Sequence, residues 1–251
     1  MTAALSPRVL LCDADGCLFP SEEPAFVASA VVTNRLLAHL GVERRFDADA
    51  LRAYALGRNF RATATHLARE AGVVLDEGDL ERRVAEERVE VTAHLGRVLR
   101  PDASVTGPLT ALAALLPLAL VSSSALARLD ACLRATELAT LFPGTVRFSA
   151  EDSLPVPASK PDPAVYRHAV ARLGAAAADA LAVEDSVTGA RSAVGAGIPT
   201  VGLVQFVPPA ERDARAAALR EAGAVDVLPS WEALARRLGA RPAAAAAAAG
   251  R

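Results

Sequence analysis

Residues 9–19 of this chain read Val9-Leu10-Leu11-Cys12-Asp13-Ala14-Asp15-Gly16-Cys17-Leu18-Phe19. The first four form a continuous apolar run, which predicts a strand that is buried on both faces. The run ends in Asp13 and Asp15, which lie on the same face of an extended segment and can converge on one point. Two carboxylates that close repel each other unless a cation or a shared proton intervenes. Taken alone, the stretch fits a ligand site and a plain Asp-Gly turn equally well.

Beyond this stretch, a helical block is followed by alternating strands and helices. Apolar residues at helical spacing predict helices at 25–40, 47–56, 59–71 and 79–99. From Pro108 onward, short apolar runs predict strands at 118–121, 146–149, 181–183, 200–204 and 225–228. The helices expected between and after them cover 125–138, 163–173, 187–196, 210–222 and 231–238. Repeated strand–helix units imply a parallel sheet flanked by helices.

These patterns predict an α/β fold, in which a Rossmann-like parallel sheet carries an inserted all-helical domain. We expect the α/β core to span 1–20 and 105–240, and the helical insertion to span 21–104. The tail at 241–251 contains seven consecutive alanines, so we expect it to be flexible rather than part of a core.

Composition excludes several classes of function. The formal net charge of −2 provides no broad basic field for nucleic acid or for a membrane surface. No apolar run approaches the ~20 residues that a membrane span needs, and the N-terminus does not resemble a signal peptide. We therefore expect a cytoplasmic protein. The three cysteines have neither zinc-site nor disulfide-framework spacing.

Lysine usage singles out one residue. Of the 27 basic residues, Lys160 is the single lysine and the other 26 are arginines. An ammonium and a planar guanidinium are not interchangeable, so a lysine that persists against this bias is a candidate functional residue. The alternative is a solvated lysine that precedes a proline-capped helix.

Polar residues follow two further predicted strands. Ser122 and Ser123 stand between a strand and a helix, where a hydroxyl and backbone amides can bind an anion or simply cap the helix. Glu184 and Asp185 follow the strand at 181–183, and oxygen ligands at two strand ends suit Mg²⁺. Because ligands bind at the carboxyl ends of parallel strands, we expect these residues near Asp13.

Together the four segments resemble the four motifs of the haloacid dehalogenase superfamily, most of whose members are phosphohydrolases. DADGCLF at 13–19 is similar to the nucleophile motif, and Ser122 takes the place of the second motif. KPDP at 160–163 and EDSVTG at 184–189 resemble the third and fourth motifs of the sugar-phosphatase-like subgroup. Two departures are Cys17, where the family usually has Thr, and Pro20, where it usually has Asp.

The resemblance implies a role for each motif residue. Asp13 would attack phosphorus to give an aspartyl-phosphate, and Asp15 would act first as general acid and then as general base. Mg²⁺ would be held by Asp13, by the backbone carbonyl of Asp15 and by Asp185, with Glu184 binding directly or through water. The phosphate would be bound by Ser122, the amide of Ser123 and Lys160.

The implied reaction is hydrolysis of a small phosphate ester, such as a sugar, polyol or sugar-acid phosphate. The inserted helical domain would act as a cap that selects the substrate. Its candidates are Arg58, Asn59 and Arg61, although a solvated helix start explains them equally well. A phosphomutase of the β-phosphoglucomutase kind shares every motif and stays open. A non-catalytic phosphometabolite-binding protein is disfavoured, because Asp13 and Asp15 are both present.

Overall fold

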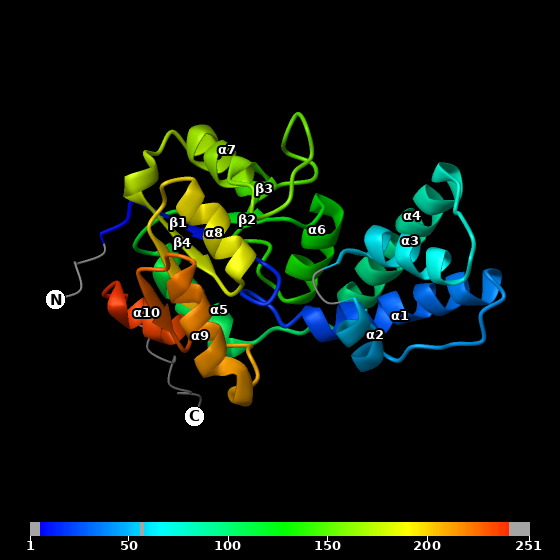
Figure 1. Cartoon of the computed structure of the whole chain (residues 1–251). Helices are drawn as coiled ribbons and strands as arrows, with labels where there is room; N and C mark the ends of the chain where they lie inside the picture. Colours follow the sequence, from blue (N-terminus) through cyan, green and yellow to red (C-terminus); the bar gives the residue numbers. More distant parts are fainter. Residues whose placement is uncertain (1–5, 56–57, 241–251) are drawn as a thin grey trace, which may run out of the picture. The chain divides into compact units, whose positions relative to one another are not determined.

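The computed structural model describes residues 6–55 and 58–240, and the predicted flexible tail at 241–251 lies outside them (Figure 1). The chain divides into two compact units. One is an α/β unit formed by Met1–Pro20 and Arg100–Arg251, and the other is a helical unit formed by Ser21–Leu99. The division at Leu99 and Arg100 precedes the predicted domain boundary at 104–105.

A helix that the sequence analysis missed explains that difference. The predicted insertion ends at 104, in a segment with prolines at 101 and 108 for which the sequence pattern predicts no helix, but α5 (Ala103–Ala113) begins there. The side chain of Asp102 accepts a hydrogen bond from the amide of Ser104 and caps the helix. Pro108 lies inside α5 and is buried together with Leu109. Apolar packing of this face outweighs the helix-breaking tendency of proline.

Six parallel strands form the sheet of the α/β unit, in the order β3-β2-β1-β4-β5-β6. Their bounds are β1 Val9–Cys12, β2 Leu118–Ser122, β3 Arg147–Ser149, β4 Ala180–Glu184, β5 Thr200–Leu203 and β6 Asp226–Leu228. The first strand pairs with β2 on one side and with β4 on the other. The predicted Rossmann-like α/β fold is confirmed.

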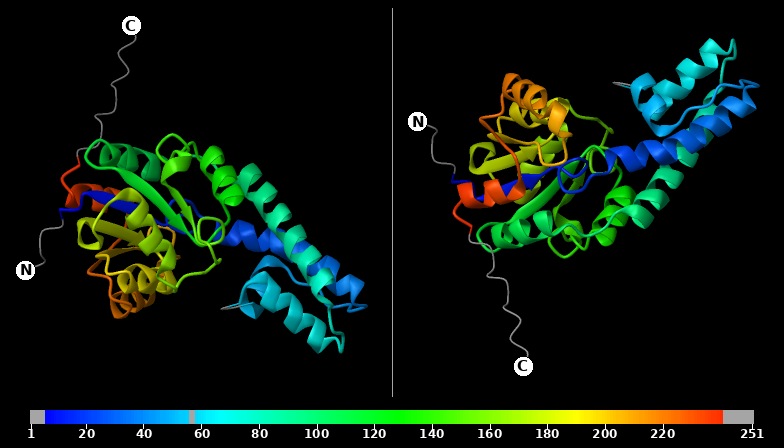
Figure 2. Two further views of the ribbon diagram at one scale, coloured as in Figure 1. Left: turned by 90° about the horizontal axis from the view of Figure 1, so that it is seen from above. Right: turned by 90° about the horizontal axis from the view of Figure 1, so that it is seen from below.

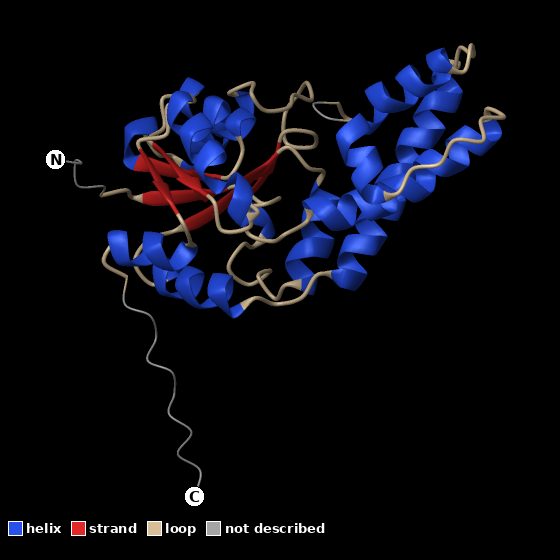
Figure 3. Cartoon of the chain, turned by 60° about the horizontal axis from the view of Figure 1, so that its bottom comes forward, coloured by secondary structure: helices blue, strands red, loops and turns tan. Residues whose placement is uncertain are grey.

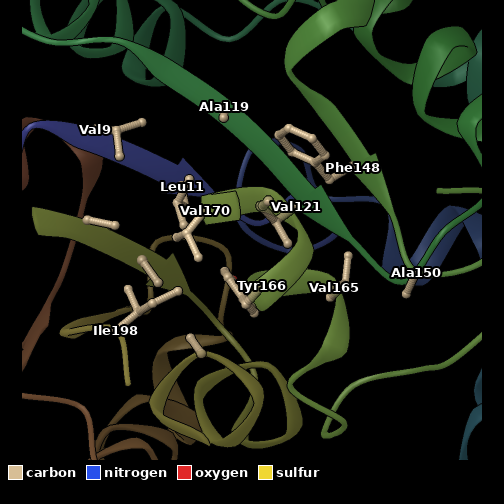
Figure 4. Packing of buried hydrophobic residues seen from close by; sticks show 14 residues of the cluster. Val9, Leu11, Ala119, Val121, Phe148, Ala150, Val165, Tyr166, Val170 and Ile198 are labelled. Atoms are coloured by element: carbon tan, nitrogen blue, oxygen red, sulfur yellow. The ribbon is translucent and has the colours of Figure 1, made fainter. Parts of the chain in front are cut away.

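Both faces of this sheet are buried. Val9 and Leu11 point into a cluster with Phe148 of β3 and with Val165 and Tyr166 of α7 (Ala164–Leu173) (Figure 4). Since side chains alternate along a strand, Leu10 and its counterparts in β2 and β4 point to the opposite face, where they are also buried. Helices lie on the two sides of the strands, as Figure 3 shows.

The remaining helices of the α/β unit follow its strands. Their bounds are α6 Leu126–Ala135, α8 Val187–Gly195, α9 Arg212–Glu221 and α10 Trp231–Arg237. The indole of Trp231 is fully buried, and its Nε1 donates a hydrogen bond of 2.8 Å to the carbonyl of Cys17. The last helix is thereby fixed to the turn that follows Asp13 and Asp15.

The helical unit consists of α1 (Glu22–His39), α2 (Ala48–Tyr54), α3 (Phe60–Glu70) and α4 (Glu77–Val98). The two long helices α1 and α4 run side by side (Figure 2). Asp47, Asn59 and Asp76 cap the N-termini of α2, α3 and α4, since each side chain accepts a backbone N–H. In the described part of the chain, no helix has the length and apolar character needed to cross a membrane.

Candidate active site

The pairing of β1 with β4 brings three carboxylates together. Cys12 pairs with Val183, so the residues that follow them, Asp13 and Glu184, emerge side by side. The amide of Asp13 donates a hydrogen bond of 3.0 Å to the carbonyl of Val183 and fixes this register. Carboxylate oxygens of Asp13, Glu184 and Asp185 lie within 4.8 Å of one another. Glu184 and Asp185 therefore lie near Asp13, as expected from the sequence, whereas Asp15 is not a member of this cluster.

Lys160 is not a solvated surface residue. Its side chain is only 5% exposed, and its ammonium donates to Asp13 Oδ1 at 2.6 Å and to Glu184 Oε1 at 2.6 Å. The third donor of the ammonium binds the carbonyl of Val121 at 2.9 Å. All three N–H groups are thus engaged by oxygens from three different strand ends.

Burial and crowding perturb the titration of this cluster. Burial raises the pKa of Asp13 well above its usual range, and although the Lys160 ammonium opposes that rise, Glu184 and Asp185 add to it. Burial, then the charge of Glu184, raises the pKa of Asp185 to about 7. Burial by itself would lower the pKa of Lys160, but the charges of Asp13 and Glu184 outweigh burial and raise it. A cation among these carboxylates would favour their ionised forms.

The donor set fits a divalent cation. Glu184 Oε2 is buried and has no hydrogen-bond partner among the described residues. A buried, unpaired carboxylate oxygen is costly unless a ligand satisfies it. The three carboxylates face the Lys160 ammonium, and the Arg215 guanidinium lies 4.0 Å from Asp185 Oδ2, so negative charge still exceeds positive charge here. Oxygen-only ligands are those that Mg²⁺ prefers. Asp13, Glu184 and Asp185 can therefore hold the metal that the sequence motifs predict.

Two glycines allow the carboxylates to approach the backbone. A Cβ on Gly16, whose φ is +78°, would lie 2.3 Å from Asp185 Oδ2. A Cβ on Gly189, in the first turn of α8, would lie 1.8 Å from Glu184 Oε2. Any side chain at either position would displace a carboxylate of the acidic cluster, so both glycines are needed for its geometry.

Tyr166 and Arg215 contact the acidic cluster, although the sequence did not single them out. The hydroxyl of Tyr166, on α7, donates a hydrogen bond of 2.6 Å to Glu184 Oε1 and is fully buried. Arg215, on α9, donates to the carbonyl of Asp185 at 2.9 Å. Neither had a signal in the sequence, because Tyr166 matched the apolar face of its helix and Arg215 is one of 26 arginines.

The side chain of Asp15 hydrogen-bonds to residues of the turn and the helix that follow β2. Its Oδ2 accepts a hydrogen bond of 2.6 Å from Ser124 Oγ, and its Oδ1 accepts one of 2.8 Å from Arg128 Nη2. The predicted metal contact of Asp15 was through its backbone carbonyl, and that contact stays a prediction. Ser124 and Arg128 were not among the residues singled out from the sequence.

The two predicted phosphate-binding serines follow β2 as expected. Ser122 is buried, and its Oγ accepts a hydrogen bond of 3.0 Å from the amide of Ser124, which leaves the hydroxyl proton for an anion. Ser123 Oγ accepts one of 3.2 Å from the amide of Lys160 and so ties the second motif to the third. Their binding of phosphate stays a prediction.

Each of the three candidate specificity residues in the helical unit has a local partner. Asn59 caps α3 through the amide of Ala62 at 2.9 Å. Arg61 forms ion pairs with two glutamates of α4, Glu77 and Glu81. Arg58 donates to the carbonyl of Tyr54 at 3.2 Å. These contacts fit a structured helix start, and a role in specificity stays a prediction.

Comparison with known proteins decides the family. A sequence profile of haloacid dehalogenase-like hydrolases matches residues 7–197, which include all four motifs. The chain belongs to this family. The resemblance drawn from the motifs is therefore confirmed, and the protein is a member of a hydrolase family.

Individual proteins are similar to this chain either over a short segment or, over nearly the whole chain, at less than 30% identity. The plasmid-encoded protein CbbY of Cupriavidus necator is 46% identical over 87 residues, which cover 34% of this chain and only 33% of that protein. A HAD family hydrolase from Deinococcus radiodurans, solved with bound phosphate and sodium, is 28% identical with a TM-score of 0.67 and covers 95% of this chain and 100% of its own. CbbY from Rhodobacter sphaeroides, solved in complex with xylulose-1,5-bisphosphate, has a TM-score of 0.67 and covers 90% of this chain and 95% of its own. Its identity is 22%, so it shows the fold alone.

Proposed function

We propose that this protein is a Mg²⁺-dependent phosphatase that hydrolyses a small phosphorylated metabolite through an aspartyl-phosphate. The observation that carries the proposal is the buried Lys160 ammonium, which binds Asp13 beside a carboxylate cluster suited to a divalent cation. An ammonium and a metal next to one carboxylate offset the repulsion between an anionic nucleophile and an anionic phosphate.

Formation of the aspartyl-phosphate requires an ionised Asp13 and a proton for the leaving group. A carboxylate oxygen of Asp13 bonds to phosphorus as the bond to the ester oxygen breaks. The ester oxygen takes a proton from the Asp15 carboxyl and departs as an alcohol. Asp13, Glu184 and Asp185 would hold Mg²⁺, which supplies charge neutralisation for the phosphoryl oxygens when bound.

Hydrolysis of the aspartyl-phosphate returns the site to its starting state. Asp15, now ionised, removes a proton from a water molecule whose oxygen bonds to phosphorus. The bond between phosphorus and Asp13 breaks, which releases inorganic phosphate and restores the Asp13 carboxylate. Throughout, Lys160 neutralises Asp13 and the transferring group, while Ser122 and the amide of Ser123 bind phosphoryl oxygens.

Two relatives support a phosphate ligand and a sugar-phosphate class. The Deinococcus radiodurans hydrolase, similar over nearly its whole length, was solved with phosphate bound. CbbY of Cupriavidus necator shares a 46% identical segment with this chain. CbbY of Rhodobacter sphaeroides was solved with a sugar bisphosphate bound. We extend the proposal to a sugar, polyol or sugar-acid phosphate as substrate, and to the helical unit as the cap that selects it.

The decisive experiment measures phosphate release from a panel of sugar, polyol and sugar-acid phosphates, in Mg²⁺ and in EDTA. The matched control is Asp13→Asn, which keeps the shape of the side chain and removes the nucleophile. Metal-dependent release by the wild type that is lost in the variant is the expected result. Isomer interconversion of a hexose phosphate without net release would instead identify a mutase, and inactivity in both assays would leave a binding protein.

A further inference from the structure

Asp15 hydrogen-bonds to two side chains that the proposed chemistry does not use. Arg128 Nη2 lies 2.8 Å from Asp15 Oδ1, and Ser124 Oγ lies 2.6 Å from Asp15 Oδ2. The side chains of Arg128 and Asp15 are 25% and 27% exposed, so this ion pair is partly withdrawn from solvent. The two oxygens of the carboxylate thus have different partners, one charged and one neutral.

Both partners lie on segments after β2 that local hydrogen bonds hold in place. Ser122 Oγ accepts a hydrogen bond from the amide of Ser124 and so stabilises the turn. From this turn the Ser124 hydroxyl donates to Asp15. The amide of Leu126, the first residue of α6, donates to Asp152 Oδ2 at 2.6 Å, which anchors the start of the helix. Arg128 stands in that first turn, and the next residue, Leu129, is buried in the core.

A fixed orientation matters because Asp15 has two successive tasks. An aspartate carboxyl turns about two single bonds, and partners on both oxygens restrict both rotations. Each proton transfer needs an oxygen within about 2.6–3.2 Å of the reacting atom, first the ester oxygen and then water. We propose that Arg128 is a positioning residue, which together with Ser124 fixes the orientation of the Asp15 carboxylate for both proton transfers. This inference rests on the proposed phosphatase function.

The same helix contains an ion pair that serves for comparison. Arg134 pairs with Asp130 one turn earlier on α6, at the surface. Asp130 also forms an ion pair with Arg147. It is not a member of the acidic cluster at the strand ends. Arg134→Gln is therefore the matched control for Arg128→Gln, since each removes one α6 guanidinium from one aspartate.

The test exploits the leaving group of the substrate. An alkyl phosphate needs the Asp15 proton as its bond to phosphorus breaks, whereas p-nitrophenyl phosphate releases a stable phenolate without it. For p-nitrophenyl phosphate, the first step appears as a burst of nitrophenolate, and steady-state turnover then depends on attack by water. The measurements are the burst rate, kcat and KM for p-nitrophenyl phosphate, and kcat and KM for the best alkyl phosphate of the panel.

If Arg128 positions Asp15, Arg128→Gln lowers kcat for the alkyl phosphate by about 10²-fold, the usual cost of misplacing a reacting group by 1 Å. KM changes little, and the nitrophenolate burst keeps its rate while the turnover that follows it slows. Arg128→Lys, which retains a cationic donor, recovers part of the lost kcat. Arg134→Gln behaves as the wild type, and all variants keep the wild-type thermal transition.

Two results overturn the inference. One is an equal loss of burst rate and of alkyl-phosphate turnover in Arg128→Gln, because general damage to the site affects both. The other is an unchanged kcat for the alkyl phosphate in that variant. A wild type that releases neither nitrophenolate nor phosphate refutes the proposed function itself, which separates the two failures.

Discussion

At the scale of single residues, Lys160 joins three strand ends through one compact cation. Its ammonium reaches Asp13, Glu184 and the carbonyl of Val121, all within 2.9 Å. A guanidinium is larger and planar, and it cannot direct three donors into so small a buried space. The identity of this residue as lysine, in a chain otherwise restricted to arginine, follows from that geometry.

We therefore expect Lys160→Arg to lose activity although the charge is kept. The expected loss in kcat is about 10²–10³-fold, the range found when one preorganised donor to a reacting anion is removed. Steady-state kinetics on the best substrate measures it. Arg134→Lys, the reverse exchange at an exposed position, should leave kcat unchanged, and a comparably active Lys160→Arg variant would contradict this interpretation of the site.

Tyr166 provides a second prediction at this scale. Tyr166→Phe removes a buried hydrogen bond to Glu184 Oε1, which keeps its bond from Lys160. The expected cost is about 1 kcal/mol of unfolding free energy, or roughly 2–4 °C in Tm. Thermal unfolding measures it. The control is Tyr54→Phe, which removes an exposed bond to Glu70 and should change Tm far less; equal shifts would refute the prediction.

At the scale of elements, α8 packs its first turn against a carboxylate. Gly189→Ala would place a Cβ 1.8 Å from Glu184 Oε2 and force that side chain out of the acidic cluster. Overpacking of this kind costs about 1–3 kcal/mol, and we expect metal binding to weaken with it. Gly195→Ala, on the same helix with its nearest contact at 3.6 Å, should be neutral or slightly stabilising. Calorimetric titration with Mg²⁺ and thermal unfolding test both, and tight Mg²⁺ binding by Gly189→Ala would refute the expectation.

The strands and the residues at their ends were predictable because both signals are local. A buried parallel strand is a continuous apolar run, and Asp13, Ser122 and Glu184 stand directly where such runs end. The α5 helix was missed because Pro101 and Pro108 gave a local signal for a break, whereas packing of its buried face decided the outcome.

The partners of the site residues were not predictable for a different physical reason. Tyr166, Arg128 and Arg215 reach the site from helices, and a helical residue arrives at a strand end only through the packing of that helix on the sheet. No spacing in the sequence records this packing. The sequence could therefore give the carboxylates and the lysine, but not the side chains that hold them.

At the scale of the whole molecule, we expect the acidic cluster to link stability to pH and to metal binding. In the metal-free protein the pKa of Asp185 is raised from its usual value to about 7, so the folded state binds its proton more tightly than the unfolded state. This contribution to stability is fully present below the unfolded pKa of about 3.9 and is lost as pH rises through 7. Burial moves Asp13 in the same direction.

Asp185→Asn removes one titrating group from the cluster and tests this linkage. In EDTA and between pH 5 and pH 8, we expect the variant to have a higher unfolding free energy than the wild type, by on the order of 1 kcal/mol or more. For a chain of this length that difference corresponds to a rise in Tm of at least about 2–4 °C. In Mg²⁺ the order reverses, because only the wild type keeps the full set of ligands and is stabilised by binding. Thermal unfolding across this pH range, with and without Mg²⁺, measures both effects. Parallel profiles for the two proteins in EDTA would show that Asp185 is not destabilising when ionised, and an equal rise in Tm with Mg²⁺ would show that it does not hold the metal.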